Sequence, residues 1–181
     1  MKPIILVTVL VHLVLSGSVH PTNLKAIVVI RGNTGNDISG LVTLEETDGL
    51  VTLEGSLSGL TPSGKHGFHI HEFGDCSAAD FTSAGSHFNP LGKEHGAPGD
   101  EERHAGDLGN IDADANGEAT IDIVDRIISL NPSSEFSVIG RAVIVHEQED
   151  DLGRGDSADS KTTGNAGARV ACGVIGIAKG E

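Results

Sequence analysis

The most informative stretch of the sequence is Gly67-Phe68-His69-Ile70-His71-Glu72-Phe73-Gly74. Its apolar residues alternate with two histidines, a pattern typical of a β-strand. In a strand, His69 and His71 point to one face, whereas Phe68 and Ile70 point to the other. Two imidazoles side by side are unusual packing residues, but they are suitable ligands for copper or zinc. A lone H-x-H pair is a weak motif, so its interpretation depends on the rest of the chain.

The strand predicted around this stretch covers residues 65–73. Other short segments of the chain also have strand character. They cover residues 24–30, 38–47, 50–60, 118–126, 140–146 and 171–178. Asp48-Gly49 lies between two of them and is a strong signal for a β-hairpin. No segment of the mature chain shows a helical period. The pattern predicts a single all-β domain, an antiparallel sandwich or barrel of seven or eight strands.

Two long segments, residues 74–110 and 147–169, are rich in glycine and polar residues and show no regular period. The first contains His87, His95 and His104. Loops of this length in a compact domain are usually functional or held in place by other groups. A bound metal ion would hold such a loop in place.

The N-terminus has the features of a secretory signal peptide. A charged start at Lys2 precedes an apolar run over residues 4–15, and small residues follow up to Ser18. The run is shorter than the roughly 20 residues that span a bilayer, which disfavours a membrane anchor. We expect residues 1–18 to be removed, leaving residues 19–181 as one soluble, secreted domain.

Charge and cysteine content narrow the function classes. The formal charge of −14, with no Trp or Tyr, argues against binding to nucleic acid or to anionic membrane surfaces. Export makes a disulfide between Cys76 and Cys172 the default expectation. Free or metal-bound thiols are the alternative.

Six histidines together with one aspartate form a coherent set of metal ligands. The set is His69, His71, His87, His95, His104, Asp107 and His146. Two four-coordinate ions need eight contacts from these seven side chains, which one bridging imidazolate would supply. A loop-borne set of three histidines and Asp107 suits zinc, and four imidazoles suit copper. Any one of these histidines alone could be an ordinary loop or core residue, and we expect His66 to be structural, bonded to backbone.

Five segments of the chain resemble the copper/zinc superoxide dismutases, in particular the secreted eukaryotic type. They are residues 67–75, 87–90, 104–110, 140–147 and 164–177, and the resemblance extends over nearly everything after residue 24. It implies an eight-stranded Greek-key β-barrel, also described as a sandwich, with a metal-binding loop and an electrostatic loop. It implies disproportionation of superoxide to O2 and H2O2 as antioxidant defence outside the cell.

The same resemblance assigns roles to individual residues. It implies copper on His69, His71, His87 and His146, and zinc on His87, His95, His104 and Asp107. His87 would bridge the two ions and carry a proton, and Asp150 would link a copper ligand to a zinc ligand. Arg169 would draw in superoxide, and Cys76 and Cys172 would form the intrasubunit disulfide.

The resemblance also implies a homodimer, with Gly74, Ile139, Gly140 and Ile177 at an apolar interface. Three features depart from the family pattern. Cys76 follows Gly-Asp directly, and Asp159 stands alone where many members have two acidic residues near the lysine, here Lys161. The C-terminal residues 178–181 contain no basic tail of the heparin-binding type.

Two readings compete with the enzyme. One is an exported module that binds or delivers copper or zinc without turnover, and it would usually lack part of the ligand set. The other is a purely structural β-sandwich, which would leave the histidine pattern and Arg169 without a role.

Overall fold

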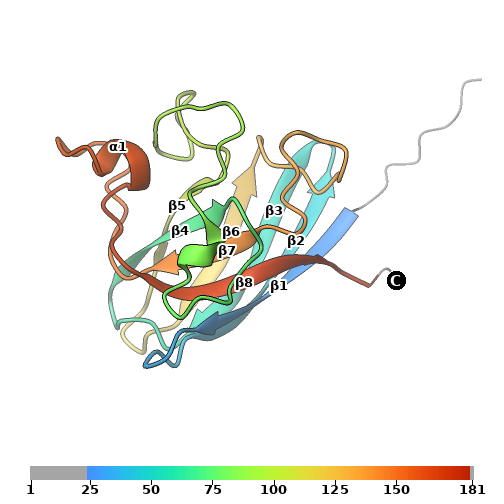
Figure 1. The fold of residues 1–181 in the computed structure, drawn as a ribbon. Coiled ribbons are helices and arrows are strands. Elements are labelled where there is room, and N and C mark those ends of the chain that lie inside the picture. Colours follow the sequence, from blue (N-terminus) through green and yellow to red (C-terminus); the bar gives the residue numbers. More distant parts are fainter. Residues whose placement is uncertain (1–23, 180–181) are drawn as a thin grey trace, which may run out of the picture.

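The computed structural model describes residues 24–179, which form a nearly closed β-barrel with long loops packed against one side (Figure 1). Its strands are β1 (Leu24–Gly32), β2 (Ser39–Thr47), β3 (Leu50–Ser58), β4 (Lys65–His71), β5 (Asp107–Asp112), β6 (Ala119–Asp125), β7 (Ala142–His146) and β8 (Arg169–Ile177). The predicted signal peptide, residues 1–18, lies outside the described residues. Among these residues, no helix is long and apolar enough to cross a membrane.

All strand pairs are antiparallel, and the order across the sheet is β5-β4-β7-β8-β1-β2-β3-β6. Chain neighbours β3 and β4 are therefore far apart in the sheet, whereas β4 pairs with β7 and β3 with β6. This crossover gives the barrel its Greek-key connectivity. The predicted fold class is confirmed.

Alternation of side chains explains the individual strands. In β1, Ala26, Val28 and Ile30 are fully buried, whereas Val29 faces outward. The inward residues of the other strands meet them in one apolar core. Burial of this kind stabilises a fold by about 25 cal/mol for each Å² of apolar surface. This core backs the barrel wall from which the histidines project.

One strand, β5, was not predicted from the sequence. It begins within the segment 74–110, and its sequence Asp107-Leu108-Gly109-Asn110-Ile111-Asp112 mixes apolar, polar and glycine residues. Its register with β4 shifts between Gly67 and His69, so the alternation is broken at that point. Pairing with β4, rather than local strand preference, makes this segment a strand.

The two long loops contain only short helical turns. A 3-10 turn, η1, covers Thr82–Ala84, and helix α1 covers Ser160–Thr163. Cys76 and Cys172 form a disulfide that ties the first loop to β8. The free-thiol alternative is therefore excluded, and the early position of Cys76 is compatible with the bond.

Candidate metal centre

The first cluster of donors consists of four buried histidines, His69, His71, His87 and His146. β4 carries two of them on one face, as the alternation predicts, and His146 ends β7 beside them. His71 Nε2 lies 3.4 Å from His146 Nε2, and the rings of His69 and His87 have centroids 4.2 Å apart. Strand pairing between β4 and β7 thus brings together residues that are 75 positions apart in the chain.

The second cluster consists of His87, His95, His104 and Asp107, all buried. One oxygen, Asp107 Oδ1, has three imidazole nitrogens around it. These are His87 Nδ1 at 2.8 Å, His95 Nδ1 at 3.0 Å and His104 Nδ1 at 3.1 Å. His87 belongs to both clusters, with Nδ1 in the second and Nε2 free for the first. Every candidate ligand named from the sequence is therefore in one of two adjoining groups.

Asp150 joins the two clusters from behind. Its Oδ2 accepts from His69 Nε2 at 2.9 Å, and its Oδ1 accepts from His95 Nε2 at 2.8 Å. Because these are the ring nitrogens that face away from the clusters, the carboxylate leaves His69 Nδ1 and His95 Nδ1 directed inward. A carboxylate behind a histidine ligand fixes its tautomer and ring orientation.

Backbone carbonyls orient two more imidazoles. His71 Nδ1 lies 2.9 Å from the oxygen of Gly85, and His146 Nδ1 lies 3.2 Å from the oxygen of Gly167. Each bond occupies Nδ1 and leaves Nε2 for the cluster. His66 stands apart from both clusters, with Nδ1 2.8 Å from the oxygen of His146, the structural contact expected for it.

Electrostatics differ between the clusters. In the first, burial and the neighbouring imidazoles lower the pKa of His69, His71 and His87, and lower the pKa of His146 to about 4. These four rings are therefore neutral near pH 7, the form that binds a metal. In the second, burial opposes protonation of His95, but Asp107 and Asp150 outweigh it and raise its pKa to about 9.

The second cluster accordingly attracts positive charge. Burial would raise the pKa of Asp107, yet hydrogen bonds from His104, His87 and His95 hold it well below its usual range. A buried carboxylate that stays ionised among imidazoles is the arrangement that a divalent cation stabilises.

Unpaired atoms provide an independent test of whether metal ions fit. Within the described residues, His69 Nδ1 and His87 Nε2 are buried and have no hydrogen-bond partner, and both face the first cluster. His95 Nδ1 also lacks a well-directed hydrogen bond, although it lies close to Asp107. Buried polar atoms without partners are costly, and metal ions would satisfy all three. The residues present therefore fit two adjacent metal ions.

Arg169 lies at the edge of the first cluster. Its Nη1 donates to the oxygen of Phe81 at 2.7 Å, and its Nη2 donates to the oxygen of Gly85 at 2.7 Å. Burial lowers the pKa of its guanidinium, and the negative charge of Asp80 opposes this. Lys161 is arranged differently, because its Nζ donates to the oxygen of Gly153 and ties the second loop to itself.

Sequence reasoning missed a buried ion pair that supports the second cluster. The guanidinium of Arg103 pairs with Asp125 at the end of β6, and it donates to the backbone oxygens of His104 and Asp107. Nothing in the local pattern around Arg103 distinguishes it from a surface arginine. Only the approach of β6 to the loop identifies its role.

Gly164 was also missed. A Cβ at this position would overlap Asp150 Oδ1 and come within 2.6 Å of His95 Nε2, and its φ of +67° suits glycine. The second loop therefore covers the Asp150 bridge closely because residue 164 has no side chain.

Two glycine-flanked loops and a barrel wall together enclose a site for two adjacent metal ions. This arrangement defines the class of the chain as a β-barrel metalloprotein with a dinuclear site.

Comparison with known proteins identifies the family within this class to which the chain belongs. Residues 38–175 match the family model of copper/zinc superoxide dismutase. Superoxide dismutase [Cu-Zn] 5 of Dictyostelium discoideum is 49% identical over 158 residues, which are 86% of this chain and 99% of the relative. Superoxide dismutase [Cu-Zn] 2 of Mesembryanthemum crystallinum is 52% identical over 155 residues, 85% of this chain and 96% of the relative. The chain belongs to the copper/zinc superoxide dismutase family.

A solved structure agrees with this assignment. The crystal structure of the clock protein EA4 superposes with a TM-score of 0.80 at 50% sequence identity. The match covers 88% of this chain and 98% of that protein. The barrel and its loops are thus those of a known fold.

Proposed function

We propose that the chain catalyses the disproportionation of superoxide, in which two superoxide ions and two protons give O2 and H2O2. The observation that carries this proposal is the position of His87, which belongs to both donor clusters. Family membership supports the reaction and the use of copper and zinc. The complete ligand set favours an enzyme over a delivery module.

Within this proposal, the first cluster would hold copper and the second would hold zinc. Four neutral imidazoles, His69, His71, His87 and His146, suit copper, whereas His87, His95, His104 and Asp107 suit tetrahedral zinc. Bound copper supplies one-electron redox chemistry, and bound zinc supplies a fixed positive charge. His87 would connect the clusters through opposite ring nitrogens, and its Nε2 would hold a transferable proton whenever it does not bind the first ion.

Arg169 attracts the substrate in a protein whose overall charge is negative. Screening limits the repulsion from distant carboxylates to about 8 Å in physiological salt. The guanidinium at the cluster edge therefore dominates the local field and draws the anion inward. Such focusing raises association rates by roughly 10- to 1000-fold. The carbonyls of Phe81 and Gly85 hold it there.

The test is the metal content of the purified protein together with superoxide-dependent turnover, with His146→Ala as the comparison variant. We expect one copper and one zinc per chain, and a loss of turnover in the variant because the first cluster loses a ligand. Zinc alone, with no turnover after copper is added, would instead identify a metal-binding module.

We further propose that the protein acts outside the cell. The predicted signal peptide, residues 1–18, and the disulfide between Cys76 and Cys172 support an oxidising compartment. Expression in a eukaryotic host should release into the medium a chain that begins at residue 19. N-terminal sequencing of that product measures the cleavage site, and retention of an uncleaved chain inside the cell would refute secretion.

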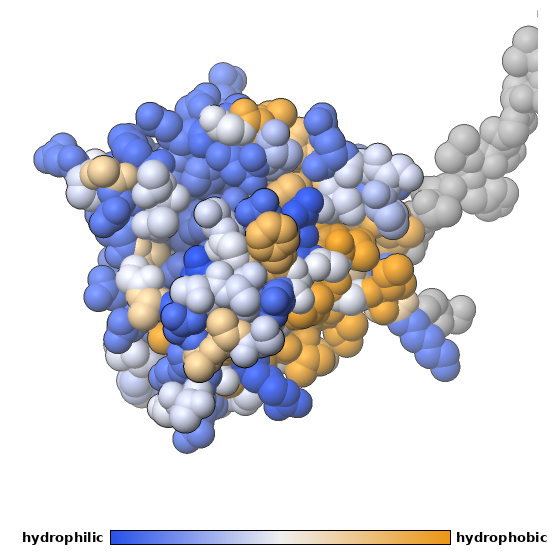
Figure 2. Space-filling model, in the orientation of Figure 1, coloured by the Kyte–Doolittle hydropathy of each residue, from blue (hydrophilic) through white to orange (hydrophobic). Residues whose placement is uncertain are grey.

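A homodimer is proposed through an apolar face over β1 and β8. Figure 2 shows apolar surface gathered there, and its exposed members include Val29, Val174 and Ile177. Gly74 lies against Gly140 and Val174, and Ile139 is partly buried against the main core. An exposed patch of this kind is typical of an interface, and a second copy covers it in a two-fold dimer.

Ile177→Asp should convert the dimer to a monomer, because the variant places a charge on a residue that is 72% exposed in the single chain. Val124→Asp is the matched control, since Val124 is an exposed apolar residue on β6. Sedimentation equilibrium measures the mass of each. A monomeric parent protein would rule out the dimer.

A further inference from the structure

Phe81 has a backbone conformation that is rare for its residue type. Its φ is +58° and its ψ is 17°, in the left-handed region, just before the turn η1. Bulky residues with positive φ are genuine outliers, and they persist only where the surrounding structure imposes them. Strained residues of this kind cluster at functional sites, so this residue's contacts are informative.

The backbone of Phe81 makes one of the two hydrogen bonds that hold Arg169. Its oxygen accepts from Arg169 Nη1 at 2.7 Å, while the oxygen of Gly85, at the other end of η1, accepts from Nη2 at 2.7 Å. Two carbonyls four residues apart thus orient both arms of the planar guanidinium. Because φ and ψ set the direction of the carbonyl, the unusual conformation of residue 81 decides where this acceptor points.

The side chain of Phe81 explains how that conformation is maintained. It is 7% exposed and belongs to a small cluster with Ala84, Ala142, Ile144 and Cys172, separate from the main core. Three of these residues, Ala142, Ile144 and Cys172, lie on β7 and β8, the strands that carry His146 and Arg169. Burial of the aromatic ring against the barrel wall offsets the backbone strain.

The disulfide ties down a different part of the loop. Cys76 lies five residues before Phe81 and packs only partly buried beside the same cluster. Within the same loop, Ser83 Oγ donates to the oxygen of Asp75 and accepts from the nitrogen of Ala78. Backbone contacts hold the far end of this segment, since Phe73 N donates to the oxygen of Ala84 and His71 Nδ1 lies 2.9 Å from the oxygen of Gly85. At residue 81 itself, the buried aromatic ring is the side-chain contact with β7 and β8.

We propose that Phe81 is a positioning residue for Arg169. Its buried ring holds residue 81 in the left-handed conformation, and the carbonyl thereby directs the guanidinium toward the path of the incoming anion. The inference rests on the proposed role of Arg169 in attracting superoxide. It assigns to an apolar loop residue a part in substrate capture rather than in metal binding.

The experiment is an optical titration of the copper- and zinc-loaded protein with azide, which is a stable anion. It measures how tightly the protein binds azide. Phe81→Gly removes both the ring and the conformational constraint, and we expect it to weaken azide binding roughly threefold to tenfold with metal content unchanged. Phe81→Leu keeps an apolar side chain in the cluster and should restore most of the affinity. Should Phe81→Gly not fold, Phe81→Ala takes its place with the same expectation.

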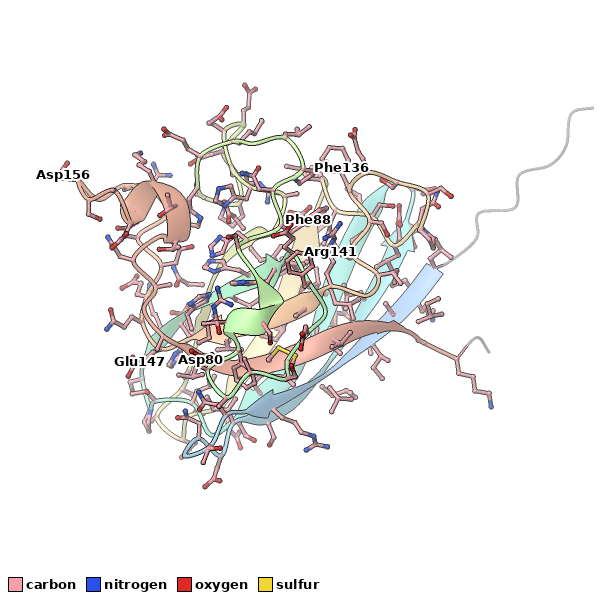
Figure 3. The ribbon with its side chains drawn as sticks, viewed as in Figure 1. Asp80, Phe88, Phe136, Arg141, Glu147 and Asp156 are labelled. Atoms are coloured by element: carbon pink, nitrogen blue, oxygen red, sulfur yellow. A yellow bond between two sulfur atoms is a disulfide. The ribbon has the colours of Figure 1, made fainter. Side chains whose placement is uncertain are left out.

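Two further variants separate this role from general stability. Phe136→Gly removes a partly buried aromatic residue that packs on the main core, and Figure 3 shows Phe136 far from Asp80, the neighbour of Phe81. It should lower the melting temperature and leave azide affinity unchanged. Arg169→Ala should weaken azide binding at least as much as Phe81→Gly.

The outcomes distinguish the two proposals. If Arg169→Ala weakens azide binding but Phe81→Gly does not, the role of Phe81 is overturned and that of Arg169 stands. If Arg169→Ala has no effect on azide binding, the attraction of the anion by Arg169 is overturned, and the inference for Phe81 falls with it. An equal loss of affinity in Phe136→Gly would mean that stability, not position, controls the anion site.

Discussion

At the scale of single residues, Asp150 has the most consequential contacts in the molecule. It is 1% exposed, and each of its carboxylate oxygens accepts from a histidine of a different cluster. Asn110 holds its backbone from both sides, and Gly164 allows the second loop to close over it. One carboxylate thus connects a histidine of the first cluster with a histidine of the second.

Replacing Asp150 by Ala should loosen both metals. Loss of a carboxylate behind a histidine ligand typically lowers metal affinity 10- to 100-fold. Competition with a chelator, followed by metal analysis, measures the effect for copper and zinc separately. Glu149→Ala is the matched control, because that neighbouring carboxylate is exposed and forms a surface ion pair with Lys65. Unchanged affinity for both metals in Asp150→Ala would disprove the bridging role.

At the scale of elements, the barrel and the first loop are joined by the pair Arg103–Asp125. Asp125 ends β6 and also accepts from the backbone nitrogens of Ile127 and Ile128. The side chain of Arg103 extends from the loop to Asp125 at the end of β6. It also donates to the backbone oxygens of His104 and Asp107 in the second cluster. The position of a strand end therefore sets the position of the loop.

Arg103→Leu should destabilise the protein by about 3–5 kcal/mol, because it leaves Asp125 buried without its charged partner. It should also weaken zinc binding, since the loop loses the bonds that hold His104 and Asp107 in place. Chemical denaturation and zinc competition measure the two effects. Arg126→Leu, at an exposed neighbouring arginine, should leave both nearly unchanged. A zinc affinity equal to that of the parent would contradict this role.

At the scale of the whole molecule, the barrel and the loops are stabilised by different means. The barrel buries one continuous apolar core, whereas the clusters are held by polar contacts between loops and strand ends. In Figure 1 the first loop lies over β7 and β8 and the second carries α1 beyond them, so both are away from β2 and β3. The two parts should therefore respond differently when metal is removed.

Removing the metals with a chelator should increase amide hydrogen exchange in the loops, residues 74–106 and 147–168, and leave β1, β2 and β3 protected. The physical reason is that ions hold the loop histidines together, whereas hydrophobic burial holds the strands. Exchange followed by mass spectrometry measures both regions in one sample. Loss of protection in β1–β3 to the same extent would show that the core also depends on metal.

Much of this arrangement could be predicted from residue patterns. Alternation in the strand 65–73 predicted that His69 and His71 share a face, and the Gly-rich loops predicted where the other ligands come from. The patterns could not predict β5, because its register shift hides the alternation. They could not predict Arg103 or Gly164 either, since Arg103 depends on Asp125, which is 22 residues away, and Gly164 lies against both Asp150 and the distant His95.

The sequence by itself determined the all-β class, the set of seven donors and the cysteine pair, because local periodicity and residue chemistry are properties of the chain alone. The tertiary structure decided which nitrogen of each imidazole faces its cluster, which carbonyls hold Arg169, and how Phe81 adopts its strained backbone. These features depend on contacts between segments far apart in the chain. Only the pairing of β4 with β7, and the closing of both loops over that pair, brings those segments together.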